Sequence, residues 1–493
     1  MKKRLVSMLL TVVMVATMLV GCGSKTSTPE TDATPTTAEE KVGAQIEVKE
    51  EATENIKVDA DYSNADLKVF IFAQDHEKAV YQSLIDRFTK NTGAKVTFEV
   101  TTSDEYNQKM LANKAAGDMP DIFYVGPEAV ASYVDDGFIQ PLDNLVDTSV
   151  VNDLWGSVGS AYRYNGKVAG SGEGSLYALP KDFSTFAFAY NKDLFDAAGL
   201  DYPDPANPYT WDEFVEVCKA LTKDTDGDGE ADQWGTANAF QWAFDAFLYT
   251  NGGHFLNEDY TKVVIDGQQE FIDAFQFFAD LTSKYNVTPS VEQDTALGGY
   301  QRWLDGQIGF YACGTWDVGA FMDKNTFPYN WGLCGWPTGK TGVSMTRNGS
   351  VGFAISADTE YPEAAAALIT LFSTDLEGQR VLSGETTGAS LQIPNIMSYA
   401  KGDFKAKIAD GTIPYGDNVD VIFNYIEGTD KYQGIFVETN YTYNSDWWST
   451  FLGGGYEYVL TGEKTAAEYC AEIQPAMQEA LDAANELKAA AQK

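Results

Sequence analysis

The sequence predicts an α/β fold with two domains, each an open, mostly parallel sheet flanked by helices. Between residues 66 and 124, apolar strand patterns alternate with helical patterns in the order strand, helix, strand, helix, strand. That alternation is typical of an open parallel sheet. About 430 of the 493 residues remain when the first 64 are set aside, and this length is enough for two domains.

The chain begins with a pattern typical of an export signal. Lys2, Lys3 and Arg4 precede an uncharged apolar run, residues 5–20, which is slightly short for a membrane span of about 20 residues. The run ends in Leu-Val-Gly-Cys, which resembles a bacterial lipobox whose Cys22 is diacylated and becomes the first mature residue. We therefore expect residues 1–22 to be a lipoprotein signal peptide, and Cys22 to anchor the protein at the extracellular face of the cell membrane. The alternative is a plain secretory peptide with a chance cysteine.

Residues 23–64 predict a disordered tether. They are rich in Thr, Pro and Glu, with 10 acidic and 4 basic residues, and cannot bury enough apolar surface to fold. The whole chain has 34 Lys and Arg against 72 Asp and Glu, a net charge of −38, which argues against nucleic acid and anionic lipid as partners. No later apolar run reaches 18 residues, so the expected membrane attachment is the lipid alone.

The first domain begins with a strand at Asp66–Ala73 and continues into a helix that stops at Gly93. The apolar residues of this helix recur at helical spacing: Val80, Leu84, Ile85 and Phe88. A strand (94–101), a helix (104–116) and a strand (121–124) follow. Ligands of open α/β sheets bind at the carboxyl ends of strands. The residues at those ends are Gln74, Asp75 and His76, then Tyr124, Gly126 and Glu128.

The stretch 176–199 predicts a chain crossing, a strand and a helix. Pro180 cannot donate a backbone hydrogen bond and disfavours helix before it. Phe183–Tyr190 is apolar throughout, as in a strand buried on both faces. Asn191 is placed to cap the next helix, and Gly199 to end it. An ordinary buried strand–helix junction is the alternative interpretation.

Two stretches resemble the extracellular solute-binding proteins of ABC importers, the group that includes maltose-binding protein. One is the Leu-Pro and apolar run ending in Tyr-Asn-Lys at 190–192; the other is the order Pro-Asp-Ile, strand, helix, Gly-Phe-Ile and Pro-Leu-Asp between 120 and 143. The resemblance implies a periplasmic-binding-protein-like fold with several hinge crossings. It implies a first lobe of residues 65–179 and 346–393 and a second lobe of residues 180–345 and 394–493.

The resemblance also implies a function and a site. A monomer would capture a sugar, most naturally an oligosaccharide, between closing lobes and deliver it unreacted to the permease subunits of an ABC transporter. Carried over by position, the ligand residues are Gln74, Asp75, Tyr124, Glu128, Asp182, Phe240, Trp242, Trp316, Asp317, Trp447 and Trp448. Core packing is the alternative role for the aromatic members. Of the adjacent pair Trp447 and Trp448, which point about 100° apart on a helix, one is expected in the core.

An acidic loop matches the front of a calcium-binding loop. Its candidate ligands are Asp224, Asp226, Asp228, Glu230 and Asp232. Position twelve is Gly235 rather than the usual Glu, so a weak or structural Ca²⁺ site and a solvated turn both remain open. No other cofactor is expected.

The remaining cysteines form no metal-binding spacing. Cys218, Cys313, Cys334 and Cys470 contain no CxxC pair, so buried free thiols are expected, with a Cys313–Cys334 disulfide as the alternative.

Enzymatic and adhesive functions are the rival classes. Paired carboxylates would suit a lipid-anchored glycoside hydrolase, but 72 acidic residues make any pair uninformative. The chain has two histidines, and neither HExxH nor GxSxG occurs. A polysaccharide-docking protein and a non-sugar solute as ligand also remain open. A phosphorylated ligand would call for a phosphate-binding loop, and the sequence has none.

Overall fold

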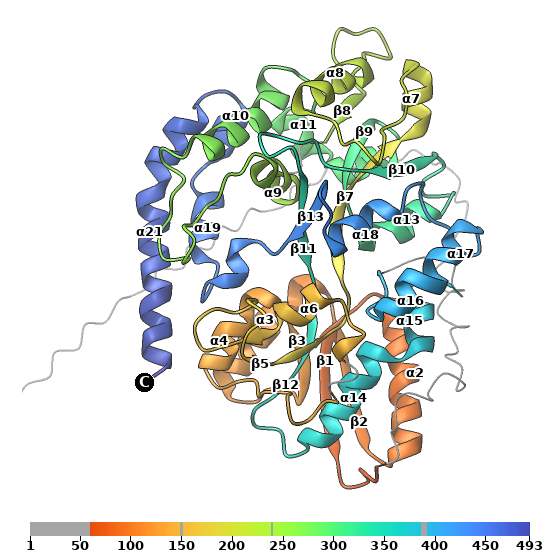
Figure 1. Ribbon diagram of the computed structural model, residues 1–493, viewed down its shortest axis with the longest axis vertical. Coiled ribbons are helices and arrows are strands. Elements are labelled where there is room, and N and C mark those ends of the chain that lie inside the picture. Colours follow the sequence, from red (N-terminus) through yellow and green to blue (C-terminus); the bar gives the residue numbers. More distant parts are fainter. Residues whose placement is uncertain (1–59, 148–150, 238–239, 386–391) are drawn as a thin grey trace, which may run out of the picture.

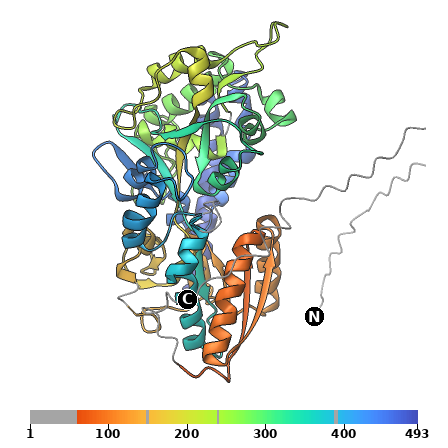
Figure 2. The ribbon, with the colours of Figure 1, turned by 90° about the vertical axis from the view of Figure 1, so that its right-hand side faces the viewer.

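The computed structural model describes residues 60–147, 151–237, 240–385 and 392–493, and within them two sheets form the centres of two lobes. The lobe built around the first sheet is the lower one in Figure 1, and the side view in Figure 2 shows the same division. The expected signal peptide, Cys22 and nearly all of the expected tether lie outside the described residues. In the described ranges, we find no helix that combines the length and apolar character needed to cross a membrane.

The first sheet has five strands in the order β2-β1-β3-β12-β6. Their bounds are β1 (Asp66–Phe72), β2 (Lys95–Thr101), β3 (Ile122–Val125), β6 (Ala178–Pro180) and β12 (Gly352–Ile355). β1 runs parallel to both β2 and β3, as the alternating pattern predicts. β12 returns from far along the chain and runs antiparallel to β3 and β6.

Helices cover this sheet and a small hairpin lies beside it. The helices are α2 (Asp75–Thr92), α3 (Ser103–Ala116), α4 (Val130–Asp135), α6 (Gly156–Ala161), α14 (Pro362–Thr374) and α15 (Leu376–Leu382), with a 3₁₀ turn η2 (Pro127–Ala129); the hairpin is β4 (Arg163–Tyr164) with β5 (Ser175–Leu176). The predicted apolar positions of α2 are all buried, and the helix ends at Gly93, whose φ of 77° is left-handed.

The second sheet has the order β13-β11-β7-β9-β8, with β10 paired to the end of β7. Its strands are β7 (Ser184–Asn191), β8 (Trp234–Thr236), β9 (Ile308–Gly314), β10 (Trp331–Cys334), β11 (Ser344–Gly349) and β13 (Tyr432–Ile435). β7 is buried along its whole length, as predicted. Asn191 caps α7 (Lys192–Ala198), which ends at Gly199 with φ 68°.

The two-lobed α/β fold is confirmed, but the sheets are mixed rather than mostly parallel. β7 enters its sheet directly from a crossing and therefore runs antiparallel to β9, β10 and β11. The helices around this sheet are α8 (Trp211–Leu221), α9 (Phe240–Thr250), α10 (Gln269–Ser283), α11 (Val291–Ala296), α12 (Gly299–Leu304), α13 (Val318–Met322), α16 (Met397–Tyr399), α17 (Lys405–Ala409), α18 (Asp420–Glu427), α19 (Asp446–Gly453), α20 (Glu457–Leu460) and α21 (Ala466–Ala491). Shorter turns are η3 (Thr315–Asp317), η4 (Ala400–Phe404) and η5 (Glu438–Tyr441).

The crossings between the lobes are hydrogen-bonded to one another. The backbone N–H of Lys181 donates to the carbonyl of Val351 over 2.6 Å, and Val351 N–H donates to Asp182 Oδ1 over 3.2 Å. The buried amide of Asn395 donates to the carbonyls of Pro180 (3.0 Å) and Lys181 (2.9 Å). Three chain segments thus form one hinge. β11 pairs within the second sheet up to its last residue, and the exact lobe boundaries stay a prediction.

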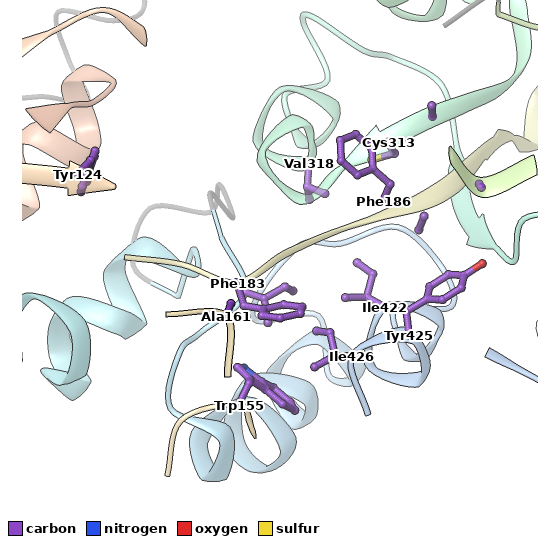
Figure 3. Packing of buried hydrophobic residues seen from close by; sticks show 14 of the residues in the cluster. Tyr124, Trp155, Ala161, Phe183, Phe186, Cys313, Val318, Ile422, Tyr425 and Ile426 are labelled. Carbon is purple, nitrogen blue, oxygen red and sulfur yellow. The ribbon is translucent and has the colours of Figure 1, made fainter. Parts of the chain in front are cut away.

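Buried rings continue the core through the hinge. Phe183, in the first crossing, lies 6.5 Å from Trp155, centroid to centroid (Figure 3). Trp155 also packs against Phe423 of α18, and its indole N–H donates to the carbonyl of Pro394 over 2.8 Å. The hinge is therefore packed as well as hydrogen-bonded.

Helix α21 extends from the second lobe to the first along the left side of Figure 1. At its beginning, Ala466 N–H donates to Gln276 of α10 over 3.0 Å. Just beyond its end, Gln492 Nε2 donates to Asp135 Oδ2 (3.1 Å) and to the carbonyl of Gly166 (2.8 Å), both in the first lobe. Its 26 residues give a length of about 39 Å.

Candidate functional site

Two exposed indoles stand beside each other in the second lobe. Trp242 is 44% exposed and Trp316 is 42% exposed, whereas most large apolar side chains are buried. Their ring centroids lie 6.3 Å apart with the planes at 70°. Buried Phe186 of β7 stacks on Trp242 at 5.5 Å and meets Trp316 edge-on at 5.0 Å. We call these three rings the aromatic corner; exposed indole faces of this kind suit the apolar C–H faces of a sugar.

Local structure fixes both indoles. Trp242 lies in the first turn of α9, a helix that is otherwise almost wholly buried. Trp316 lies in η3, directly after the carboxyl end of β9. The indole of Trp316 folds back over Gly314, where a Cβ atom would fall 2.4 Å from Cζ2. Glycine is therefore required two residues before this tryptophan.

Asp317 shapes that turn. Its carboxylate accepts a hydrogen bond from the backbone N–H of Gly314 over 3.1 Å, which closes η3 around Trp316. Burial raises the pKa of Asp317 to about 7, and the Gly314 N–H offsets part of the rise. The structure thus supports Asp317 as a residue that positions Trp316.

An ion pair borders the aromatic corner. Arg347 Nη1 of β11 lies 3.4 Å from Asp245 Oδ2 of α9. The guanidinium carbon of Arg347 lies 5.6 Å from the ring centre of Trp242 and 5.9 Å from that of Phe186. Asp245 follows Trp242 by three residues and so shares its side of the helix. Burial raises the pKa of Asp245, and the charge of Arg347 lowers it in part.

The first lobe contributes Glu128, one of the predicted residues. Glu128 lies in η2 after β3 and is exposed to solvent on one side. The protein that encloses it on its other sides raises its pKa, and the charge of Arg347 lowers it in part. Turn η2, which holds Glu128, packs against turn η5 of the second lobe. The site is at the junction of the lobes.

A second polar pair holds the neighbouring turn η5. The buried carboxylate of Glu438 accepts a hydrogen bond from Phe255 N–H over 2.9 Å and lies 3.0 Å from His254 Nδ1. The bond to Glu438 raises the pKa of His254. Turn η5 packs against η2 of the first lobe, so this pair braces the same junction.

Several predicted ligand residues are part of the core. Tyr124 is 3% exposed and packs against Phe72 and Phe353. Phe240 is 4% exposed and stacks on Phe244 at 4.6 Å. Trp447 is 1% exposed. Buried rings offer no face to a ligand, so we leave these three predicted residues out of the proposed site.

Trp447 is buried and its neighbour Trp448 is half-buried, so one member of the adjacent tryptophan pair is in the core, as expected. The indole of Trp448 stacks on Phe451 at 5.5 Å with planes 6° apart, and meets Phe255 edge-on at 5.0 Å. It therefore belongs to the margin of the core.

Three polar predicted residues lie at the start of α2 and in the hinge. Gln74 and Asp75 are exposed at the beginning of α2, where Gln74 N–H donates to Glu77 over 3.0 Å. Asp182 is engaged by the hinge and by Lys181, whose Nζ lies 3.0 Å from its carboxylate and 2.7 Å from that of Glu77. Asp182 is therefore bound to other residues of the hinge. A ligand role for Gln74 and Asp75 stays a prediction.

Sequence reasoning missed Phe186, Asp245, Arg347, His254 and Glu438. The spacing of Trp242 and Asp245 at i and i+3 was a signal that the sequence offered. Arg347 lies at a half-buried position of β11, which only the structure shows.

The acidic loop brings three of its five predicted ligands together. Carboxylate oxygens of Asp224, Asp226 and Asp232 lie within 4.8 Å of one another, while Asp228 and Glu230 are outside this group. Asp224 also accepts hydrogen bonds from Gly227 and Gly229 N–H groups, as in a self-supporting turn. Oxygen ligands suit Ca²⁺. Calcium binding here stays a prediction.

The structure excludes the alternative disulfide. Cys313 and Cys334 are buried and free, and they lie on β9 and β10, on opposite edges of β7. Strands two apart are separated by about 9–10 Å, beyond the Cα separation of about 7 Å that a disulfide tolerates. Cys218 and Cys470 are also buried free thiols, as expected.

Comparison with known proteins gives several matches. A family described as bacterial extracellular solute-binding protein matches residues 73–375. The maltotriose-binding protein of Pyrococcus abyssi is 23% identical over 256 residues, 51% of this chain and 49% of the relative. The arabinooligosaccharide-binding protein of Halalkalibacterium halodurans is 28% identical over 155 residues, 31% of this chain and 33% of the relative. The chain thus spans about half the length, or less, of these curated relatives.

Solved structures share the fold. An ABC substrate-binding protein from Listeria monocytogenes in complex with cycloalternan has a TM-score of 0.68 at 22% identity, covering 84% of this chain and 98% of that one. UgpB from Mycobacterium tuberculosis in complex with glycerophosphocholine has a TM-score of 0.66 at 20% identity, with the same coverage of 84% and 98%. Because the family match covers more than half of the sequence, this chain belongs to the bacterial extracellular solute-binding protein family.

Proposed function

We propose that this protein captures a sugar, an oligosaccharide in particular, between its two lobes and delivers it unreacted to an ABC transporter. The observation that carries the proposal is the aromatic corner beside the ion pair of Asp245 and Arg347, with Glu128 at the junction of the lobes. Indole faces cover the C–H surface of a sugar, while carboxylates and a guanidinium bond its hydroxyls. Relatives named for maltotriose and arabinooligosaccharide binding support this ligand class.

The proposed partners are the permease subunits, with the protein acting as a monomer. Closure of two lobes over a ligand would present both lobes together to the transporter. We further propose that Cys22 carries a lipid that keeps the protein at the extracellular face of the cell membrane. The test is a Cys22→Ala variant expressed in a bacterial host: the wild type should incorporate labelled palmitate and the variant should not. Equal labelling of the two proteins, or no label in the wild type, would contradict the anchor.

Calorimetry with a sugar panel tests the ligand class. The panel contains maltodextrins, arabino-oligosaccharides and cyclic glucans, and we expect one series to bind in a 1:1 ratio. Chromatography should recover the bound sugar unchanged. Release of new reducing ends would indicate a glycoside hydrolase, and binding only to insoluble polymer would indicate a docking protein.

The glycerophosphocholine complex of a protein with the same fold makes a non-sugar solute the second candidate. A thermal-shift screen of polyols and phosphodiesters tests it, and a shift there without any sugar binding would favour that class.

A further inference from the structure

The ion pair beside the aromatic corner carries an inference about which sugars this site accepts. Among the described lysines and arginines, Arg347 is the one placed over rings of the corner. Its side chain is 24% exposed, so a ligand can reach part of it. A guanidinium has five N–H donors, so one ion pair leaves donors for other acceptors.

The charge of Arg347 is already matched within the protein. Asp245 lies 3.4 Å away and its side chain is 8% exposed, so the pair is held at short range in a poorly solvated position. Glu128 adds a second carboxylate on the first lobe, in turn η2 at the junction where η2 packs against η5. Glu438 lies close enough to Asp245 to raise its pKa through like-charge repulsion. The surroundings of Arg347 therefore carry more negative than positive charge.

We propose that Asp245 is a specificity-determining residue: by pairing with Arg347, it makes the site accept uncharged sugars and reject sugars that carry a carboxylate or phosphate. This inference rests on the proposed function. A hydroxyl can accept a hydrogen bond from the open side of Arg347 without disturbing the pair. An anionic group placed there meets the buried carboxylate of Asp245 at close range, and like charges at a desolvated contact are strongly unfavourable.

The test compares matched neutral and acidic ligands on the intact protein. The neutral ligand is the best-binding oligosaccharide of the panel, and the acidic set is the same sugar with a free primary alcohol oxidised to a carboxylic acid, one ring at a time. Some acidic analogues will carry the modified ring beside Arg347. The wild-type protein should bind these at least about tenfold more weakly than the neutral parent sugar, which corresponds to about 1.4 kcal/mol.

Asp245→Asn removes the charge and keeps the shape of the side chain. The ratio of acidic to neutral affinity should rise about tenfold or more for at least one analogue, because Arg347 then has an uncompensated charge. Asp273→Asn is the matched control, since Asp273 forms an exposed pair with Lys340 at 2.8 Å on α10, away from the corner. It should leave the ratio unchanged.

Glu128→Gln provides a second variant at an exposed position, where failure to fold is not expected. It should move the ratio in the same direction, by about threefold. Two results would overturn the proposal. In the first, the wild type binds every acidic analogue as tightly as the neutral parent sugar. In the second, Asp245→Asn and Glu128→Gln both give the same ratio of acidic to neutral affinity as the control Asp273→Asn. Neutral binding with an unchanged ratio refutes this inference alone, whereas absence of all sugar binding refutes the proposed function.

Discussion

Replacing Trp316 by alanine should weaken sugar binding far more than it weakens the fold. The indole is 42% exposed, and for a ring of about 250 Å² this leaves about 100 Å² that a stacked ligand could cover. At about 25 cal/mol per Å², full coverage is worth about 2.5 kcal/mol, or about sixtyfold in Kd. The ligand covers at most one face and edge, so the expected loss is about tenfold to sixtyfold.

The assay is titration calorimetry with the best sugar of the panel, accompanied by thermal melting of the free protein. Tyr458→Ala is the matched control, because Tyr458 is a 49% exposed ring on α20, outside the aromatic corner. It should leave Kd within about twofold. An unchanged Kd for Trp316→Ala, together with a large fall in melting temperature, would refute the reasoning and return Trp316 to the core.

Three further predictions concern metal, pH and the hinge. If the acidic loop binds calcium, a chelator should lower the melting temperature and added Ca²⁺ should restore it, and Asp224→Asn should abolish the response; no shift with chelator would assign the loop to a turn. Because the folded-state pKa of Asp317 is raised from 3.8 to about 7, its ionisation opposes folding, so the wild type should lose stability relative to Asp317→Asn as pH rises through that window. Urea unfolding at both ends of the window measures this, and a constant difference would contradict the raised pKa. Asn395→Ala should lower the unfolding free energy by about 3 kcal/mol, since it strips buried carbonyls of their donor; exposed Asn325→Ala is the control, and a loss below about 1 kcal/mol would mean that water replaces the amide.

Local sequence patterns were sufficient for the elements that position the site. The apolar spacing of α2, the uniform burial of β7, and the caps at Asn191 and Gly199 depend on near neighbours, so the sequence alone predicts them. These predictions were confirmed because each depends on a few adjacent residues. Trp316 was a candidate through the family resemblance, and the structure places it directly after the carboxyl end of β9.

The sequence alone could not predict which individual aromatic rings are buried. Phe240 and Trp242 are two residues apart on one helix, yet one is 4% exposed and the other 44%. Phe240 packs against Phe275 and Phe278 of α10 and against Phe451 of α19, about 200 residues further along the chain, and these contacts decide which side of α9 faces the core. The pairing of Arg347 with Asp245 likewise depends on β11 joining β7, whose residues lie more than 150 positions earlier. Such contacts arise from tertiary structure and leave only faint local signals.

The helix α21 has a consequence for watching this protein at work. Its beginning is bonded to one lobe and Gln492, just past its end, to Asp135 and Gly166 of the other, so relative rotation of the lobes must stretch, shift or break that distal attachment. A small environment-sensitive dye attached near residue 492 would therefore report lobe motion optically without touching the sugar site. For the same reason, a bulky affinity tag fused there would interfere with the motion.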